Sequence, residues 1–136
     1  MYDELIAGRI YFGGADDAAS AVDEEGIEKV IDVRVNGRKE KVDYPYIHKP
    51  IADESDEIPL SIQDGVKEVI NAYQAGEKVY FHCGGGNGRA SVMAVATLME
   101  LELADSLEEA ENMVKEARPS ANIRPNMREA LEKLYK

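Results

Sequence analysis

The chain has no second cysteine: among its 136 residues, Cys83 stands alone. It therefore cannot form an internal disulfide, and an oxidised Cys83 has no resolving thiol within the chain. The first residues, 1–5, lack the pattern of a signal peptide, and no apolar run reaches membrane-spanning length. We expect one domain over residues 1–136, located in the reducing cytoplasm and without a membrane partner.

Basic residues and histidines are also scarce. Sixteen lysines and arginines face 27 aspartates and glutamates, which gives a net charge of −11. This charge disfavours nucleic acids and other polyanions as partners, although such fields fade over about 8 Å at physiological ionic strength. Two histidines and one cysteine make no convincing metal site, so we expect neither a metal nor a cofactor.

What the chain does contain is a glycine-rich loop around its cysteine, with the sequence His-Cys-Gly-Gly-Gly-Asn-Gly-Arg over residues 82–89. The apolar run 79–81 precedes the loop and the apolar run 92–98 follows it, which is typical of a turn from a strand into a helix. Such a turn directs backbone N–H groups and the positive end of the helix dipole at an anion. We expect the same field, with Arg89, to favour the thiolate form of Cys83.

The loop also has the composition of a phosphate site. Glycines let the backbone approach an anion closely, and a guanidinium binds two phosphate oxygens at once. The spacing differs from that of the Walker and dinucleotide-binding loops, because Arg89 stands where the dinucleotide pattern requires its third glycine. We expect six residues to bind phosphate: Gly84, Gly85, Gly86, Asn87, Gly88 and Arg89.

On these residues the sequence resembles the cysteine-dependent protein tyrosine and dual-specificity phosphatases, whose signature is His-Cys, five residues, Arg, then Ser or Thr. Residues 30–34, which end in Asp-Val-Arg, resemble an early strand of that family, and residues 118–126 resemble its C-terminal segment. The likeness covers nearly the whole chain and is closest to small prokaryotic dual-specificity-like members.

The resemblance implies hydrolysis of a phosphomonoester in two steps through a phosphocysteine. Cys83 would be the nucleophile, Arg89 would stabilise the phosphoryl group, and Asp53 would be the general acid, with Asp56 as the second candidate for the acid. Asp53 is distinguished from other acidic surface residues only by its position about thirty residues before Cys83.

One departure from the signature concerns turnover. Ala90 stands where the family has a hydroxyl that stabilises the departing thiolate, and Ser91 is one position further on. Since a helix advances about 100° per residue, the two positions face differently. We expect the phosphocysteine to accumulate unless Ser91 takes the role.

The expected substrate is a phosphorylated protein or a small aryl phosphate, with phosphotyrosine favoured and phosphoserine or phosphothreonine as further candidates. Positions 84–88 carry no lysine or arginine, unlike family members that act on phosphoinositides or RNA. The basic residues Arg38, Lys39 and Lys41 either flank the site or form a solvated loop. A phosphoresidue-binding pseudophosphatase and a rhodanese-type sulfurtransferase remain alternatives, and the oligomeric state is unknown.

The hydrophobic pattern predicts an α/β fold. Four strands are expected, at 10–12, 28–33, 46–50 and 78–82, alternating with helices at 61–75, 89–101, 107–117 and 125–134. Ser106 begins a capping box for the third helix. This alternation favours a mainly parallel central sheet of four to five strands with helices on both faces, and ligands bind such sheets beyond the carboxyl ends of their strands.

Overall fold

The computed structural model describes all residues, 1–136, and contains one five-stranded sheet in the order β1-β2-β5-β3-β4. Strands β2, β5, β3 and β4 run parallel, and β1 pairs antiparallel with β2 at one edge. Their bounds are β1 Asp3–Ile6, β2 Ile10–Gly14, β3 Lys29–Asp32, β4 Tyr46–His48 and β5 Val79–Cys83. The predicted fold class is therefore confirmed.

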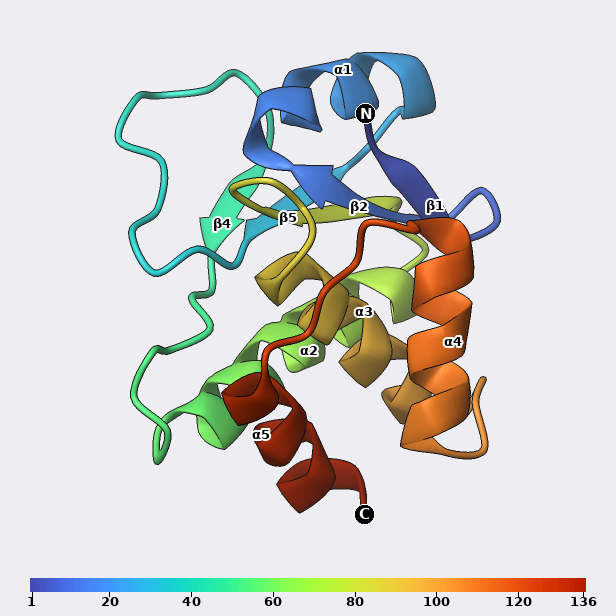
Figure 1. Cartoon of the computed structure of the whole chain (residues 1–136). Helices are drawn as coiled ribbons and strands as arrows, with labels where there is room; N and C mark the ends of the chain where they lie inside the picture. Colours follow the sequence, from blue (N-terminus) through green and yellow to red (C-terminus); the bar gives the residue numbers. More distant parts are fainter.

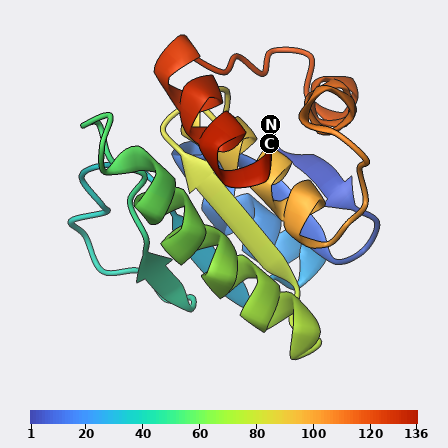
Figure 2. The same ribbon diagram turned by 90° about the horizontal axis from the view of Figure 1, so that it is seen from below.

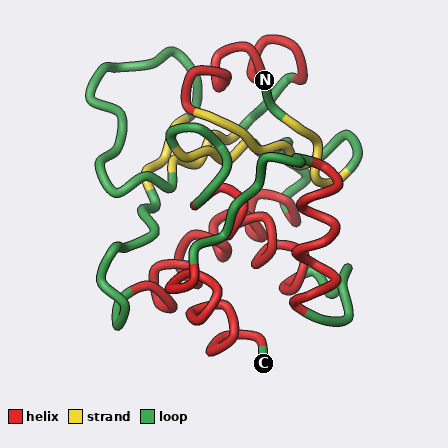
Figure 3. The backbone as a smooth tube through the Cα atoms, in the orientation of Figure 1, coloured by secondary structure: helices red, strands yellow, loops and turns green.

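Helices cover the two faces of the sheet unequally (Figures 1 and 3). One helix lies on one face: α1, Ala18–Glu25, which follows the short 3₁₀ turn η1, Ala15–Asp17. The other face carries α2 Ile58–Gln74, α3 Arg89–Glu100, α4 Leu107–Ala117 and α5 Pro125–Tyr135. Seen from that side in Figure 2, α2 runs beside β5. None of these helices combines the length and apolar character needed to cross a membrane.

All four predicted strands and all four predicted helices are present, whereas β1 and α1 were missed. Strand β1 is only four residues long and none of them is fully buried, so its alternation is weak. Helix α1 buries only Ala18 and Ala21, whose small side chains leave no clear apolar period.

Helix α2 begins earlier than the sequence predicts, at Ile58 and not at Ser61. Pro59 fits the first helical turn because its missing N–H is not needed there. The Ser61 hydroxyl has another role: it donates to the Ile58 carbonyl (2.8 Å) and accepts from the Ala52 N–H (2.9 Å). That second bond ties the segment before Asp53 to α2. The predicted Ser106 cap is confirmed, since its hydroxyl accepts from the Glu109 N–H (3.1 Å).

The core lies between the sheet and α3. Every residue of α3 from Ala90 to Leu98 is buried, as are all five residues of β2 and of β5. Because β2, β5 and β3 are parallel, their carboxyl ends meet at one edge of the sheet. Cys83, the last residue of β5, lies at this edge, next to Gly14 in the strand register.

Candidate active site

Cys83 occupies the floor of the loop that joins β5 to α3. It is 7% exposed, and the Gly86 N–H donates to its sulfur at 3.2 Å. Gly86 has a left-handed φ of +84°, and a Cβ there would lie 2.5 Å from the Gly13 carbonyl carbon. The loop can therefore turn back onto the Cys83 sulfur only with glycine at position 86.

Three carbonyls of this loop are held by groups outside it. The Gly84 carbonyl accepts from the Ala15 N–H (3.0 Å), and the Asn87 carbonyl accepts from the Asn122 N–H (2.7 Å). The Gly85 carbonyl accepts from Arg118 Nη2 (2.9 Å). In Figure 1 the segment between α4 and α5 runs alongside the loop, which explains the contacts from Asn122 and Arg118; Ala15 belongs to η1, after β2. The external bonds fix the conformation of the loop.

Arg118 makes the largest number of hydrogen bonds among the residues that hold this loop. Its Nε donates to Asn87 Oδ1 (3.1 Å), and its Nη1 donates to both the Met1 carbonyl and Asp3 Oδ2 (2.8 Å each). The Ser120 hydroxyl also donates to Asn87 Oδ1 (2.6 Å). One partly buried guanidinium thus connects the loop to β1, the strand that the sequence did not predict.

Arg89 is the first residue of α3, and its side chain is directed toward the segment before α2. Its Nε donates to the Ile51 carbonyl (2.8 Å), and its Nη2 binds Asp53 Oδ1. The structure therefore brings Arg89 and Asp53 together, and Arg89 also lines the cavity over Cys83. Asp56 has no contact with Arg89; with Asp53, it lines a neighbouring acidic groove of about 700 Å³.

A buried polar network supports the strand end beside Cys83. Asp32, fully buried, accepts from Arg34 Nε (3.0 Å) and Nη2 (2.8 Å) and from the Tyr46 hydroxyl (2.6 Å). Burial raises the pKa of Asp32, but the hydrogen bonds from Arg34 and Tyr46 outweigh it, so the net pKa lies below the ordinary value. Asp32 is consequently an anion at neutral pH.

His82 lies next to this network and is also fully buried. Burial lowers its pKa, against the opposing effect of Asp32, whose Oδ1 is 3.8 Å from Nδ1. The Nδ1 donates to the Cys83 carbonyl at 3.1 Å, so His82 helps to order the backbone where the loop begins. A neutral, fully buried imidazole suits such a positioning role.

The cavity over Cys83 has a volume of about 220 Å³. Besides Cys83, Gly84, Gly88 and Arg89, it is lined by Arg34, Val35, Arg124 and Met127. Sequence reasoning missed these last four as lining residues, because it looked for basic residues inside the loop. Arg34 and Arg124 lie in the two segments outside the loop that resemble the phosphatases, and this resemblance could have identified them as residues near the site.

Other sequence expectations concern residues near the cavity. Arg38, Lys39 and Lys41 do not line it; Arg38 Nη2 donates to the Ala15 carbonyl (2.9 Å), and both lysines are exposed. Ala90 is fully buried. Ser91 is fully buried too, and its hydroxyl has no hydrogen-bond partner.

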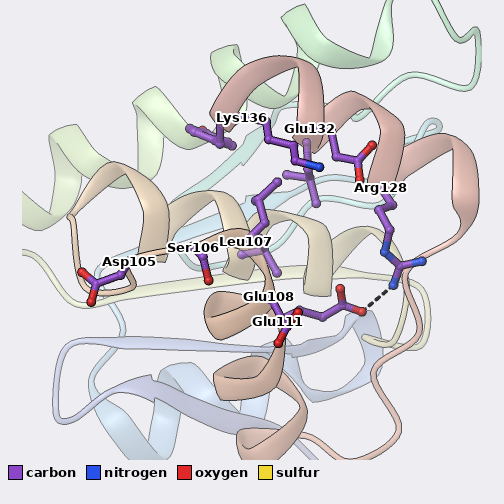
Figure 4. A pocket seen from close by; sticks show the side chains of 11 residues that line it. Asp105, Ser106, Leu107, Glu108, Glu111, Arg128, Glu132 and Lys136 are labelled. Carbon is purple, nitrogen blue, oxygen red and sulfur yellow. Dashed lines mark hydrogen bonds and ion pairs between the residues drawn. The ribbon is translucent and has the colours of Figure 1, made fainter.

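A second cavity, of about 550 Å³, is lined by residues of α3, α4 and α5 and by the turn before α4 (Figure 4). It shares no residue with the cavity over Cys83, and its one arginine, Arg128, is paired with Glu111. It therefore contains neither a cysteine nor an unpaired arginine for an anionic substrate.

Comparison with known proteins agrees with this geometry. Residues 10–136 match the family described as "Dual specificity phosphatase, catalytic domain". The chain therefore belongs to the dual-specificity phosphatase family. A search of curated protein sequences finds no match.

Solved structures share the fold. Tk-PTP in its active form is 23% identical, with a TM-score of 0.82 over 98% of this chain and 95% of that one. Human DUSP28 is 23% identical, with a TM-score of 0.80 over 98% and 92%. PTPMT1 is 20% identical, with a TM-score of 0.82 over 99% and 94%. Family and fold together support a phosphatase.

Proposed function

We propose that this protein hydrolyses phosphomonoesters, with phosphotyrosine or aryl phosphates as substrates, through a phosphocysteine at Cys83. The observation that carries the proposal is the position of the Cys83 sulfur, which accepts from the Gly86 N–H at the floor of an arginine-lined cavity. An anion held by a backbone donor is what this loop is shaped to bind. Val35 and Met127 in the same wall suit an aromatic leaving group.

In the first step the Cys83 thiolate attacks phosphorus. A sulfur–phosphorus bond forms, the ester oxygen–phosphorus bond breaks, and the leaving oxygen takes a proton from Asp53. In the free protein the Asp53 carboxyl contacts Arg89, so it must leave that arginine to reach the leaving oxygen. A bound phosphoryl group would compete for the Arg89 guanidinium and so release the Asp53 carboxyl toward the leaving group.

In the second step water attacks the phosphocysteine. An oxygen–phosphorus bond forms, the sulfur–phosphorus bond breaks, and the Asp53 carboxylate accepts the proton from water. The departing Cys83 thiolate has the Gly86 N–H as a donor, but no hydroxyl at position 90. Release should therefore be the slower step.

The experiment is hydrolysis of p-nitrophenyl phosphate by the wild type and by variants of each proposed group. We expect Cys83→Ser and Arg89→Ala to lose activity by more than about 10³-fold, and Asp53→Asn by about 10²–10⁴-fold. Asp56→Asn is the matched control, since it removes the same charge from the same loop without a contact to Arg89. Full activity in Asp53→Asn with loss in Asp56→Asn would assign the acid to Asp56.

The same assay separates the alternatives. A pseudophosphatase would bind aryl phosphates without turning them over, and a sulfurtransferase would produce thiocyanate from cyanide without phosphatase activity. The match to the phosphatase family favours hydrolysis over sulfur transfer. The cytoplasmic location stays a prediction.

The choice of phosphotyrosine over lipids rests on the loop itself, which has no lysine or arginine at positions 84–88. PTPMT1, however, has been solved in complex with PI(5)P. Initial rates on a phosphotyrosine peptide and on PI(5)P-containing vesicles therefore belong in the same experiment. Faster hydrolysis of the vesicles would reverse the proposed preference.

A further inference from the structure

The wall of the Cys83 cavity carries more positive charge than one phosphate group requires. Three of its eight lining residues are arginines, Arg34, Arg89 and Arg124, and none is acidic. The chain as a whole has the opposite balance, with 27 acidic residues against 16 basic ones. Arg89 and the loop N–H groups are the donors assigned to the scissile phosphate, so Arg34 and Arg124 have no assigned role in binding it.

Arg34 is held rigidly with one side of its guanidinium unused. Its Nε and Nη2 bind the two carboxylate oxygens of buried Asp32, while Nη1 has no partner within the protein. The side chain is 29% exposed. A guanidinium fixed in this way loses little conformational entropy when it binds a further oxygen.

Arg124 is the one arginine of the seven whose side chain has no hydrogen bond or ion pair in the structure. Arg128, one turn further on, is paired with Glu111, and Arg118 is paired with Asp3. Arg124 precedes α5 in an extended conformation, with φ −68° and ψ 154°, and it is exposed at the cavity wall. Its charge is therefore free to bind a ligand.

We infer that Arg34 and Arg124 form a subsite for a second anionic group, so that the preferred substrates are aryl phosphomonoesters that carry another negative charge, as in a phosphotyrosine next to an acidic residue. This inference rests on the proposed phosphatase function and deepens it. The two arginines come from the segments after β3 and before α5, so they approach the cavity from outside the phosphate loop.

The acidic groove beside the cavity determines which way a substrate with two anionic groups would be oriented. Asp53, Glu54, Asp56, Glu57 and Asp64 line that groove and would repel an anionic side chain. A substrate with a second anionic group would therefore bind with that group toward Arg34 and Arg124 and away from the segment that carries Asp53. The chain thus combines long-range repulsion of anions with local selection of one orientation.

The test uses carboxyphenyl phosphates with the carboxylate in the ortho, meta or para position, each compared with its uncharged methyl ester. For each pair, kcat/KM of the acid is divided by that of the ester. This acid-to-ester ratio for Arg124→Gln is then divided by the same ratio for the wild type. The quotient removes the difference in leaving-group reactivity between acid and ester, because that difference is the same for both proteins. We expect this quotient to fall about three- to tenfold for at least one isomer, and further in Arg34→Gln/Arg124→Gln.

Arg128→Gln is the matched control, because it removes the same charge from the start of the same helix but does not line the cavity. Its quotient should stay within twofold of one. Equal losses for acid and ester in Arg124→Gln would mean that Arg124 holds the scissile phosphate, which overturns the subsite. A quotient within twofold of one for every isomer in both the single and the double variant would also overturn it.

Binding measurements separate this inference from the proposed function. If the wild type hydrolyses neither acid nor ester, the proposed function fails, and the subsite is then judged by calorimetry on Cys83→Ser with and without Arg124→Gln. A loss of affinity confined to the acid supports the subsite, and an equal loss or none overturns it. Among larger substrates, a preference for PI(5)P vesicles over an acidic phosphotyrosine peptide that disappears in Arg124→Gln would overturn the peptide assignment.

Discussion

Replacing Arg118 should damage the active site although this residue does not line the Cys83 cavity. The variant Arg118→Ala removes four hydrogen bonds, to Met1, Asp3, Gly85 and Asn87, from a side chain that is 11% exposed. Water replaces part of them at the exposed carbonyls, so we expect a loss of about 2–3 kcal/mol in the free energy of unfolding. For a chain of this size that is a decrease in Tm of about 5–12 °C.

The larger effect should be on catalysis. Without Arg118 the Gly85 carbonyl and the Asn87 side chain lose their anchor, and a displacement of about 1 Å in a catalytic loop costs about 10²-fold in rate. We expect kcat/KM for p-nitrophenyl phosphate to fall about 10- to 100-fold at a temperature where the variant is fully folded.

Two further variants make this test selective. Arg118→Lys keeps the charge but not the forked geometry, so it should recover stability more than activity. Arg128→Ala, which removes an exposed arginine with one carboxylate partner, should leave kcat/KM within twofold. The reasoning would be refuted by a folded Arg118→Ala with wild-type kcat/KM.

Three other predictions follow from the same loop and its support. Stopped-flow hydrolysis of an aryl phosphate should show a burst that Ala90→Ser removes; a linear trace, or a burst that appears only after Ser91→Ala, would show that Ser91 supplies the missing hydroxyl. Gly86→Ala should abolish vanadate binding measured by calorimetry, because a Cβ at 2.5 Å from backbone cannot be accommodated; wild-type affinity would contradict this. Tyr46→Phe should raise the pKa of Asp32 by removing a hydrogen-bond donor, so the stability that this carboxylate contributes at higher pH is lost at a less acidic pH. Acid titration followed by circular dichroism should therefore show an unfolding midpoint at a higher pH than in the wild type. An unmoved midpoint would refute the assignment.

The sequence was sufficient for the sheet because strong local patterns specify its parallel strands. Residues of β5 are buried on both faces, and residues 79–81 form a continuous apolar run two positions before Cys83. Strand β1 has no such pattern: it is short, half-buried and held by pairing with β2 and by the Asp3–Arg118 ion pair, which joins residues 115 positions apart. Contacts over that separation leave no local signal in a single sequence.

The same distinction applies to the site. The loop could be recognised because Cys83 to Arg89 are contiguous. Of its four glycines, Gly86 is the one whose left-handed φ and close contact with Gly13 require glycine. Arg118 and Arg124 could not be placed by periodicity, since both lie outside helices, in the segment between α4 and α5. Asp53 could be predicted in part. Its position before Cys83 in the sequence suggested it as the acid, but its contact with Arg89 depends on the Ala52–Ser61 hydrogen bond and on the earlier start of α2.

The net charge of −11 is compatible with an anionic substrate because repulsion by the surface carboxylates and attraction by the cavity arginines act over different distances. Carboxylates outside the cavity repel anions through solvent, where the field fades over about 8 Å. The basic side chains that line the cavity are three arginines, and two of them are already oriented by carboxylates: Arg34 by Asp32 and Arg89 by Asp53. Asp32 is buried behind its arginine and cannot leave, whereas Asp53 is 70% exposed and free to move. A substrate phosphate would therefore displace Asp53 and not Asp32, which makes the release of the proposed general acid a consequence of phosphate binding.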